Sequence, residues 1–240
     1  MNTMLEIRKV SKLYSTYMVG IKEKLLGNKV YTNFLIHGTV TGRLSSRNPN
    51  MQNIPRDTTA SVIKTMFIPP SGKLILQVDY SQAELRVMAA QANEPNMLNA
   101  FNAGYDIHLA TACRNNDWDY DWALKKLESE DGTPEYTKVK TERKYAKTIN
   151  FGIIYGQGPK KLAEALEITK EQAASRLTEY YQNNPKVAKF IKSQHRKVKK
   201  DGYVVSIFGR KRRLPDIWLI GDSNWGKRSE AERQSVNAPI

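Results

Sequence analysis

The chain has 240 residues, of which 38 are Lys or Arg and 24 are Asp or Glu, so its formal net charge is +14 at pH 7. This excess favours a polyanionic partner, nucleic acid before an anionic membrane surface. The single cysteine excludes an internal disulfide framework, and no apolar run approaches the length of a membrane span. The amino end lacks the apolar segment of a signal peptide. We therefore expect a cytoplasmic protein with one large domain or two small ones.

The amino-terminal part is predicted to combine a helix with strands. Apolar side chains at helical spacing predict an amphipathic helix over residues 4–19. Residues 30–37 and 38–46 are rich in β-branched and aromatic side chains and predict strands. Residues 47–57 form a turn-rich loop with many amide side chains, and residues 59–67 predict a short helix or turn.

A short apolar run over residues 74–78 predicts a buried strand that ends at Asp79. A helix is expected to begin near Ser81, because Ser81 and Glu84 match a capping box. Asp79 should then lie partly buried between a strand and a helix, where a carboxylate needs a cation or hydrogen-bond donors beside it. These residues alone favour metal binding no more than a plain turn and capping role.

Residues 95–114 predict two short helices, and residues 115–134 predict an exposed acidic helical segment. His108, near a helix start, is by itself more typical of packing or capping than of chemistry. The acidic segment partly matches a calcium-binding EF-hand loop, through Asp117, Asp119, Asp121 and Glu128. Trp122 occupies the position where that loop needs glycine, so calcium binding is not expected.

Residues 143–156, RKYAKTINFGIIYG, predict a helix with four chemically distinct side chains along one stripe. Arg143, Lys147, Phe151 and Tyr155 recur every four residues, so each is turned by only about 40° from the last, and the stripe is about 18 Å long. Two cations suit a polyphosphate and a flat ring suits a base. Periodicity alone favours an ordinary amphipathic helix, and the rest of the chain decides between the two interpretations.

The carboxyl-terminal part is predicted to be mostly helical. Helices are expected over residues 159–168, 169–183, 185–200 and 224–237, with a strand over residues 203–208 and a basic turn, GRKRR, after it. Thr169 is a predicted N-cap. The many cations between Lys186 and Arg213 are typical of a solvated face, and they also have the density expected for phosphate contacts.

Seven short motifs follow one another along nearly the whole chain. In order they are TGRLSS (41–46), NMQNIP (50–55), DYSQAELR (79–86), GYDIH (104–108), RKYAKTINFGIIYG (143–156), FGRKRRLPD (208–216) and ERQSVNAPI (232–240). The ordered set closely resembles the polymerase region of family A DNA polymerases, the bacterial DNA polymerase I type and its phage relatives. The resemblance implies template-directed DNA synthesis, with deoxynucleoside triphosphates added to a primer 3′ end.

The resemblance also implies an α+β fold, with a partial palm built on an antiparallel sheet and a mostly helical fingers subdomain. Residues 1–94 would form part of the palm with the helix at the base of the thumb. Residues 95–200 would form the fingers, and residues 201–240 would return to the palm.

By the same resemblance, Asp79, Arg143 and Lys147 would be the catalytic residues. Asp79 would bind two Mg²⁺ ions and the Tyr80 carbonyl would help to hold one of them, because magnesium takes hard oxygen ligands. Glu84 would exclude a ribose 2′-hydroxyl. The nucleotide-binding residues would be Tyr80, Ser81, Gln82, Glu84, His108, Arg143, Lys147, Phe151 and Tyr155.

Within that set, Arg143 and Lys147 would hold the phosphates, and Lys147 would also protonate the leaving pyrophosphate. Phe151 would stack near the sugar and base, and a Phe here implies discrimination against dideoxynucleotides. Tyr155 would occupy the position of the template base until the fingers close. Contacts with primer–template DNA are implied for Lys12, Ser15, Arg43, Gln52, Asn53, Arg233 and Asn237.

The chain also departs from the family pattern. It lacks the His-Asp-Glu hairpin that carries the second metal-binding carboxylate, and Asp201, Asp216 and Asp222 do not stand in a comparable setting. By the same comparison with the family pattern, we expect a chain without the exonuclease and most of the thumb. We therefore expect little activity from the chain alone and a companion polypeptide that carries the rest of the palm, an arrangement that fits a phage origin.

Two alternatives stay open from the sequence. The first is a non-catalytic DNA-binding relic or accessory protein that retains the basic groove. The second is a single-subunit RNA polymerase, against which Glu84 and the setting of Phe151 argue.

Overall fold

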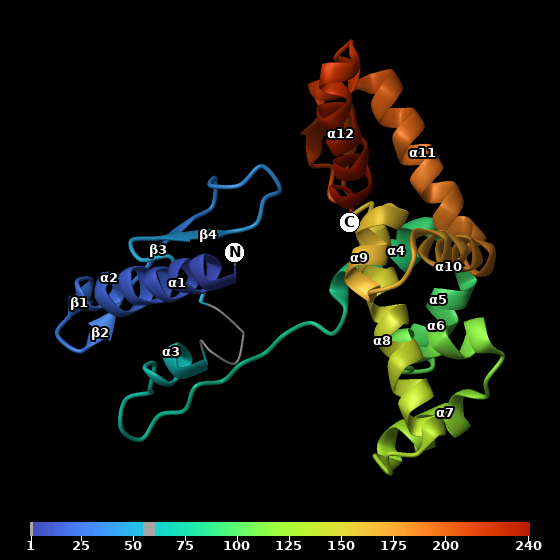
Figure 1. Ribbon diagram of the computed structural model, residues 1–240. Coiled ribbons are helices and arrows are strands. Elements are labelled where there is room, and N and C mark those ends of the chain that lie inside the picture. Colours follow the sequence, from blue (N-terminus) through green and yellow to red (C-terminus); the bar gives the residue numbers. More distant parts are fainter. Residues whose placement is uncertain (1, 55–60) are drawn as a thin grey trace. The chain divides into compact units, whose positions relative to one another are not determined.

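The computed structural model describes residues 2–54 and 61–240. The end of the predicted loop 47–57 and the start of the predicted helix 59–67 lie outside these residues. The chain divides into two compact units, Met1–Asp79 (unit 1) and Tyr80–Ile240 (unit 2), whose elements are labelled in Figure 1. No helix of the described part has both the length and the apolar character needed to cross a membrane.

Unit 1 begins with a long helix, as predicted for residues 4–19. It consists of α1 (Asn2–Lys12), a π-helical segment (Leu13–Val19) and α2 (Gly20–Lys22). Most of its apolar side chains are exposed. Tyr17 and Ile21 are buried and pack with Ile63 from α3 (Ser61–Thr65). The Tyr17 hydroxyl donates a hydrogen bond to the backbone carbonyl of Asn53, which ties the long helix to the loop at residues 48–54.

The strands of unit 1 are short antiparallel pairs. β1 (Leu25–Leu26) pairs with β2 (Lys29–Val30), and β3 (Asn33–Leu35) pairs with β4 (Ser45–Arg47), with Phe34 opposite Ser46. The two strands predicted over residues 30–37 and 38–46 are thus only partly formed, since the residues between β3 and β4 are in turns, bends or irregular structure.

The predicted strand over residues 74–78 is not formed in this structure. Leu74 and Leu76 are 94% and 86% exposed, and Asp79 is exposed too. A strand needs a neighbouring strand for its backbone groups and a packed surface for its apolar side chains. None of the described strands pairs with these residues. The predicted partial burial of Asp79 is therefore also wrong.

Unit 2 is a helical bundle with one small hairpin. Its helices are α4 (Ala83–Ala92), α5 (Pro95–Asn102), α6 (Ile107–Asn116), α7 (Tyr120–Ser129), α8 (Pro134–Ile154), α9 (Pro159–Leu166), α10 (Lys170–Asn183), α11 (Pro185–Asp201) and α12 (Trp225–Asn237). The hairpin pairs β5 (Tyr203–Val205) with β6 (Lys211–Arg213), and two 3₁₀ turns follow it at Pro215–Trp218 and Asp222–Asn224. The strand predicted over residues 203–208 is shorter, and part of the predicted basic turn forms β6.

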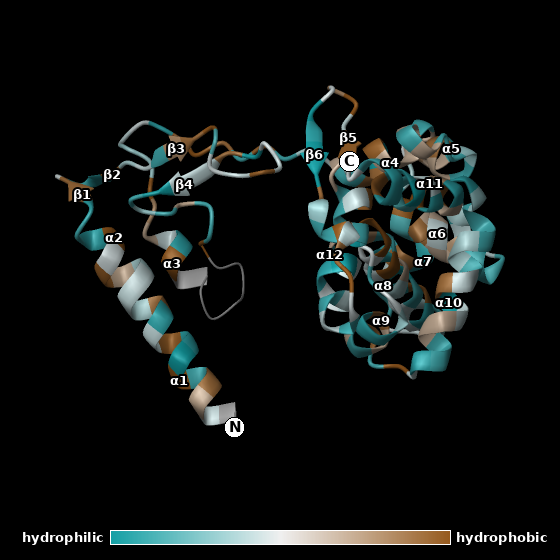
Figure 2. Cartoon of the chain, turned by 90° about the horizontal axis from the view of Figure 1, so that it is seen from above, coloured by the Kyte–Doolittle hydropathy of each residue, from teal (hydrophilic) through white to brown (hydrophobic). Residues whose placement is uncertain are grey.

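α8 is central to the core of unit 2. Ile149, Ile153 and Ile154 of α8 are buried in one cluster that includes Leu85 of α4 and Leu162 of α9. Apolar stretches recur along the helices of this unit in Figure 2. The predominance of helices with small antiparallel sheets confirms the α+β class. The division into two compact units does not test the assignment of residues 1–94, 95–200 and 201–240 to palm and fingers. That assignment stays a prediction.

Helix starts were predicted with mixed success. The N-cap at Thr169 is confirmed, since its side chain and that of Gln172 form a reciprocal capping box. The capping box at Ser81 and Glu84 is wrong. α4 begins at Ala83, and Gln82 before it has a left-handed φ of 55°, so Ser81 lies outside the helix and does not cap it.

Candidate functional site

Three residues of the predicted stripe, Arg143, Lys147 and Phe151, lie on α8, and Tyr155 is the C-cap residue just after the helix ends at Ile154. α8 is capped by Thr133, whose side chain accepts a hydrogen bond from the backbone N–H of Tyr136. Its apolar side is buried in the core, so the opposite side is left for polar residues. Arg143 and Phe151 are half-buried, whereas Lys147 and Tyr155 are exposed. The helix therefore presents two cations and a ring along an accessible face, and its C-cap adds a phenol.

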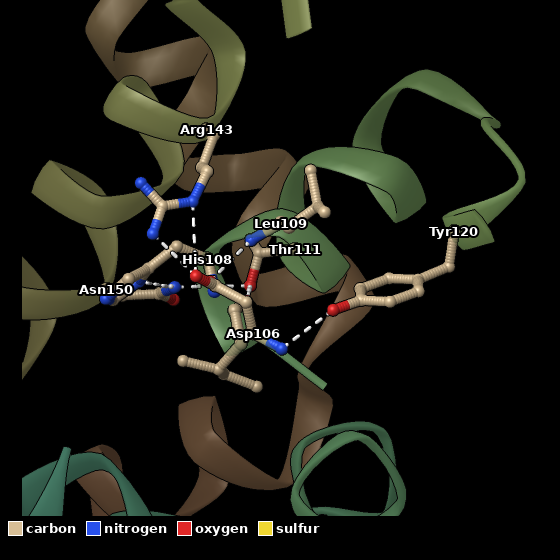
Figure 3. Close-up of polar contacts among 8 residues, drawn as sticks. Asp106, His108, Leu109, Thr111, Tyr120, Arg143 and Asn150 are labelled. Carbon is tan, nitrogen blue, oxygen red and sulfur yellow. Dashed lines mark hydrogen bonds and ion pairs between the residues drawn. The ribbon is translucent and has the colours of Figure 1, made fainter. Parts of the chain in front are cut away.

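Arg143 is held by an acidic residue that the sequence interpretation missed. Its Nε and Nη2 donate to Oδ2 of Asp106 over 3.2 and 2.5 Å. Oδ1 of Asp106 caps α6 by accepting from the backbone N–H groups of His108 and Leu109 (Figure 3). Burial raises the pKa of Asp106, but the bonds from Arg143 and the two backbone donors outweigh it and leave the pKa below its usual value.

Tyr120 of α7 contacts Tyr105 and Asp106, the residues just before α6. The backbone N–H of Asp106 donates to the Tyr120 hydroxyl over 2.8 Å, and the Tyr120 ring stacks on Tyr105 with ring centroids 3.8 Å apart. α7 also has apolar contacts of its own, because Ala123 is buried with Leu109 and neighbouring residues. The segment predicted as an exposed acidic helix is therefore packed against the site on one side.

His108 lies in the interior beside α8. It is 3% exposed, its Nδ1 is 3.1 Å from Nδ2 of Asn150, and its ring centroid is 5.6 Å from that of Phe151. Burial lowers the pKa of His108 to about 4; Asp106 opposes this shift, and the charges of Arg143 and Lys147 add to it. The imidazole is therefore neutral at pH 7.

Glu84 is joined to the end of the stripe. The Tyr155 hydroxyl donates to Oε2 of Glu84 over 2.8 Å, which links α4 to the carboxyl end of α8. Three more predicted nucleotide-binding residues come directly before α4. Tyr80 and Ser81 are exposed, and Gln82 is half-buried. Five of the predicted nucleotide-binding residues, Glu84, Arg143, Lys147, Phe151 and Tyr155, thus line α8 and the adjoining start of α4.

Arg233 of α12 reaches the same end of α8. Gly156 follows the helix with a φ of +63°, and a Cβ atom there would lie 2.7 Å from Cγ of Arg233. The guanidinium donates to Ser229 Oγ over 2.8 Å and pairs with Glu230. Asn237, the last residue of α12, is half-buried.

The predicted DNA-binding residues of unit 1 are mostly exposed. Lys12 and Asn53 line one cavity of about 860 Å³. Ser15 donates to the backbone carbonyl of Ser11 over 2.8 Å and does not line this cavity. Arg43 and Gln52 are exposed at the surface. The structure thus brings Lys12 and Asn53 to one cavity.

The motifs agree with the comparisons at the level of the family. Residues 1–240 match the sequence profile of DNA polymerase family A. The chain belongs to DNA polymerase family A. It is 36% identical over 239 residues to the thermostable DNA polymerase I of Thermus aquaticus, an alignment that covers 98% of this chain and 27% of that protein. It is 33% identical over 239 residues to the DNA polymerase I of Caldicellulosiruptor bescii, covering 98% and 26%.

The solved structures agree with this family assignment. The chain is similar to the POL domain of Pol1 from M. smegmatis, determined in complex with DNA primer-template and dNTP, with a TM-score of 0.78 and 30% identity. That similarity covers 97% of this chain and 38% of the other. The chain therefore spans about a quarter of the length of the curated family A relatives and about two fifths of that polymerase domain structure.

The residues predicted to bind metal do not form a complete site here. The carboxylate of Asp79 and the carbonyl of Tyr80 are hard oxygen donors of the type magnesium prefers. Within residues 2–54 and 61–240, however, no group of three or more His, Cys, Asp or Glu side chains could hold a metal ion. The oxygen donors of Asp79 and Tyr80 are of the type that magnesium binds, but the described residues supply too few of them for a complete site.

Two residues that contact the candidate site residues escaped the sequence interpretation, Asp106 and Asn150. Asp106 carried a usable signal, since an Asp directly before a predicted helix is a preferred N-cap. Its pairing with Arg143, 37 residues away, carried none. Asn150 lies among apolar residues of α8, and the neighbouring residues do not indicate its contact with His108, 42 residues earlier.

Proposed function

We propose that the chain forms the nucleotide-binding part of a family A DNA polymerase and takes part in template-directed addition of deoxynucleotides to a primer 3′ end. The observation that carries the proposal is the stripe on α8, with His108 beside it and Glu84 bonded to its last residue. A row of two cations, a ring and a phenol matches the order of phosphates, sugar and base in a nucleoside triphosphate.

In this proposal Arg143 and Lys147 bind the triphosphate. Asp106 fixes the Arg143 guanidinium through Nε and Nη2, and a guanidinium has five N–H donors, so several remain for phosphate oxygens. Lys147 has the ammonium that would protonate the pyrophosphate as it leaves. Phe151 would stack near the base and sugar and select against dideoxynucleotides.

The other nucleotide contacts come from the start of α4 and from α6. Glu84, held by the Tyr155 hydroxyl, would occupy the space of a ribose 2′-hydroxyl and so select deoxyribose. Tyr155 would take the place of the template base until a nucleotide arrives. Gln82 and His108, with Tyr80 and Ser81, would complete the pocket.

Primer–template DNA is the proposed polyanionic partner. Lys12, Ser15, Arg43, Gln52 and Asn53 would contact it from unit 1, and Arg233 and Asn237 from unit 2. A net charge of +14 supports such a partner, because cations that neutralise phosphates release condensed counterions. Binding should therefore weaken as salt rises.

The metal part of the proposal needs more than the described residues. Asp79 would bind two Mg²⁺ ions, with the Tyr80 carbonyl as a further ligand. We propose that a companion polypeptide with the rest of the palm brings the second carboxylate. The cytoplasmic setting and the phage origin stay predictions alongside this one.

The nucleotide site can be tested without catalysis. We expect Lys147→Ala to weaken binding of a deoxynucleoside triphosphate by about tenfold to a hundredfold, because a hydrogen bond to a charged group contributes about 1.5–3 kcal/mol. Lys189→Ala removes an equally exposed lysine from α11 and serves as the control. Binding would be measured by fluorescence or calorimetry, with DNA binding measured in parallel.

Three results would contradict the proposal. Equal effects of Lys147→Ala and Lys189→Ala would mean that the stripe does not bind the triphosphate. DNA binding without nucleotide binding would favour the non-catalytic DNA-binding alternative. Primer extension with magnesium should require a second polypeptide that carries the second metal-binding carboxylate. Extension by the chain alone would contradict the proposal that its metal site is incomplete.

A further inference from the structure

Three buried polar side chains meet between α6 and α8. Asn150 is fully buried, and His108 and Thr111 are 3% and 5% exposed. Nδ2 of Asn150 lies 3.1 Å from Nδ1 of His108 and 3.2 Å from Oγ1 of Thr111. Figure 3 shows the three side chains converging beneath Arg143. Buried polar groups are costly unless bonded, so the direction of each bond matters.

The direction of every bond in this group follows from one contact. Oγ1 of Thr111 lies 2.7 Å from the backbone carbonyl of Ile107, and two oxygens at that distance need a proton between them. The carbonyl has no proton, so the Thr111 hydroxyl donates to it. Its oxygen can then only accept from Asn150, which requires the amide nitrogen of Asn150 to face Thr111.

The same amide nitrogen faces His108. Because Nδ2 donates, Nδ1 of His108 must accept and carries no proton. A neutral imidazole has one proton, which then lies on Nε2. Nε2 has no hydrogen-bond partner among the described residues, so its N–H is available to a ligand. The low pKa of His108, caused first by burial, agrees with a neutral ring.

The arrangement costs stability, which argues that it is not mere packing. Oδ1 of Asn150 is buried and has no partner within the described chain. Turning the amide over would give Oδ1 a donor only if the His108 proton moved to Nδ1, and it would place Oδ1 against the Thr111 oxygen, which has no proton to offer. Thr111 therefore fixes the amide, and the amide fixes the imidazole.

We propose that Asn150 is a positioning residue for His108, which it holds as the Nε2–H tautomer so that the ring offers an N–H donor to an anionic ligand oxygen. This inference rests on the proposed function for the identity of that ligand, a triphosphate oxygen that can only accept. Asn150 itself touches no nucleotide and acts through His108.

The test reads the tautomer directly in the unliganded chain. The sequence has only three histidines, so nitrogen NMR of the ¹⁵N-labelled protein gives a simple spectrum, and His108→Gln identifies the signals of His108. We expect a single Nε2–H tautomer at pH 7, with no titration until the pH falls toward about 4. A proton on Nδ1, or exchange between both tautomers, overturns the proposal.

Asn150→Asp reverses the bond by replacing the amide donor with an acceptor. The expected result is a shift of the proton to Nδ1 and a rise in the pKa of His108 above that of the unsubstituted chain, because a carboxylate stabilises the imidazolium. The control is Asn116→Asp, which adds the same charge at the other end of α6 and should leave the tautomer unchanged. An Nε2–H tautomer in Asn150→Asp contradicts the proposal, and the spectrum of the unsubstituted chain decides the matter even if this variant does not fold.

Failure of the proposed function would be visible separately. A chain that shows the Nε2–H tautomer but does not bind a deoxynucleoside triphosphate would contradict nucleotide binding and leave the role of Asn150 standing. A chain that binds the triphosphate with His108 protonated on Nδ1 would retain the proposed function and remove the role of Asn150.

Discussion

Unit 1 and unit 2 differ in how many of their large apolar side chains are buried. In unit 2 a continuous core joins α4, α5, α8, α9 and α10. In unit 1 the buried cluster is Tyr17, Ile21 and Ile63, while Leu74 and Leu76 are exposed. Large exposed apolar stretches mark surfaces that bind something else. Unit 2 thus buries its apolar side chains within its own described residues, whereas unit 1 leaves more of its large apolar side chains exposed.

The largest effect should separate the two cores. Ile149→Ala removes a side chain that is 1% exposed, and we expect a loss of about 2–5 kcal/mol in the free energy of unfolding, as for buried aliphatic truncations. Leu76→Ala, at an 86% exposed site, should change it by no more than about 0.5 kcal/mol. Urea unfolding followed by circular dichroism measures both, and tryptophan fluorescence reports unit 2 alone, because all four tryptophans lie there. A large loss from Leu76→Ala would show that residues 74–78 are packed.

A smaller effect should distinguish packed from unpacked turns. Gly156 and Gly132 have φ values of +63° and +68°, but an added Cβ meets Arg233 at the first and nothing within 4 Å at the second. Left-handed backbone strain alone costs a non-glycine residue about 1–2 kcal/mol, so Gly132→Ala should lose roughly that. Gly156→Ala should lose more, about 2–3 kcal/mol, because Arg233 must also move. Tryptophan fluorescence in urea measures both variants, and equal losses would show that Arg233 does not pack on Gly156.

The smallest effect concerns the charge at the site. Asp106→Asn removes the ion pair with Arg143 and should cost about 1 kcal/mol at pH 7. The folded protein holds the pKa of Asp106 below its usual value, so the stabilisation is present above the unfolded pKa and is lost as the pH falls through the lower folded pKa. The difference in unfolding free energy between the two proteins should thus vanish at low pH. A difference that persists there would mean that the charge of Asp106 is not its cause.

The elements that the sequence predicted well are those whose causes are local. Thr169 caps α10, and the spacing of Arg143, Lys147 and Phe151 along α8 follows from helical periodicity alone. The α+β class and the family followed from the ordered motifs. The cap and the helical spacing depend on residues within a few positions of one another, and each motif is itself a short local run, although the family followed from the order of the motifs along nearly the whole chain.

The failures depend on contacts between distant residues. The strand at residues 74–78 requires a neighbour that local pattern does not reveal, and the burial of Asp79 depended on that strand. Ser81 failed as a cap because Gln82 takes a left-handed conformation. Asp106 and Asn150 gain their roles from partners 37 and 42 residues away, which a propensity for helix or turn does not encode. Such pairings become visible only once α6 and α8 are packed together.

The hydroxyl of Tyr120 has a consequence for how this site could diverge among relatives. It accepts the backbone N–H of Asp106, and Asp106 in turn orients Arg143. Substitutions in α7 would therefore change how firmly Asp106 holds Arg143, while every residue of α8 stays the same. In the proposed nucleotide site, natural variation in α7 would then change the affinity without changing the residues that contact the triphosphate.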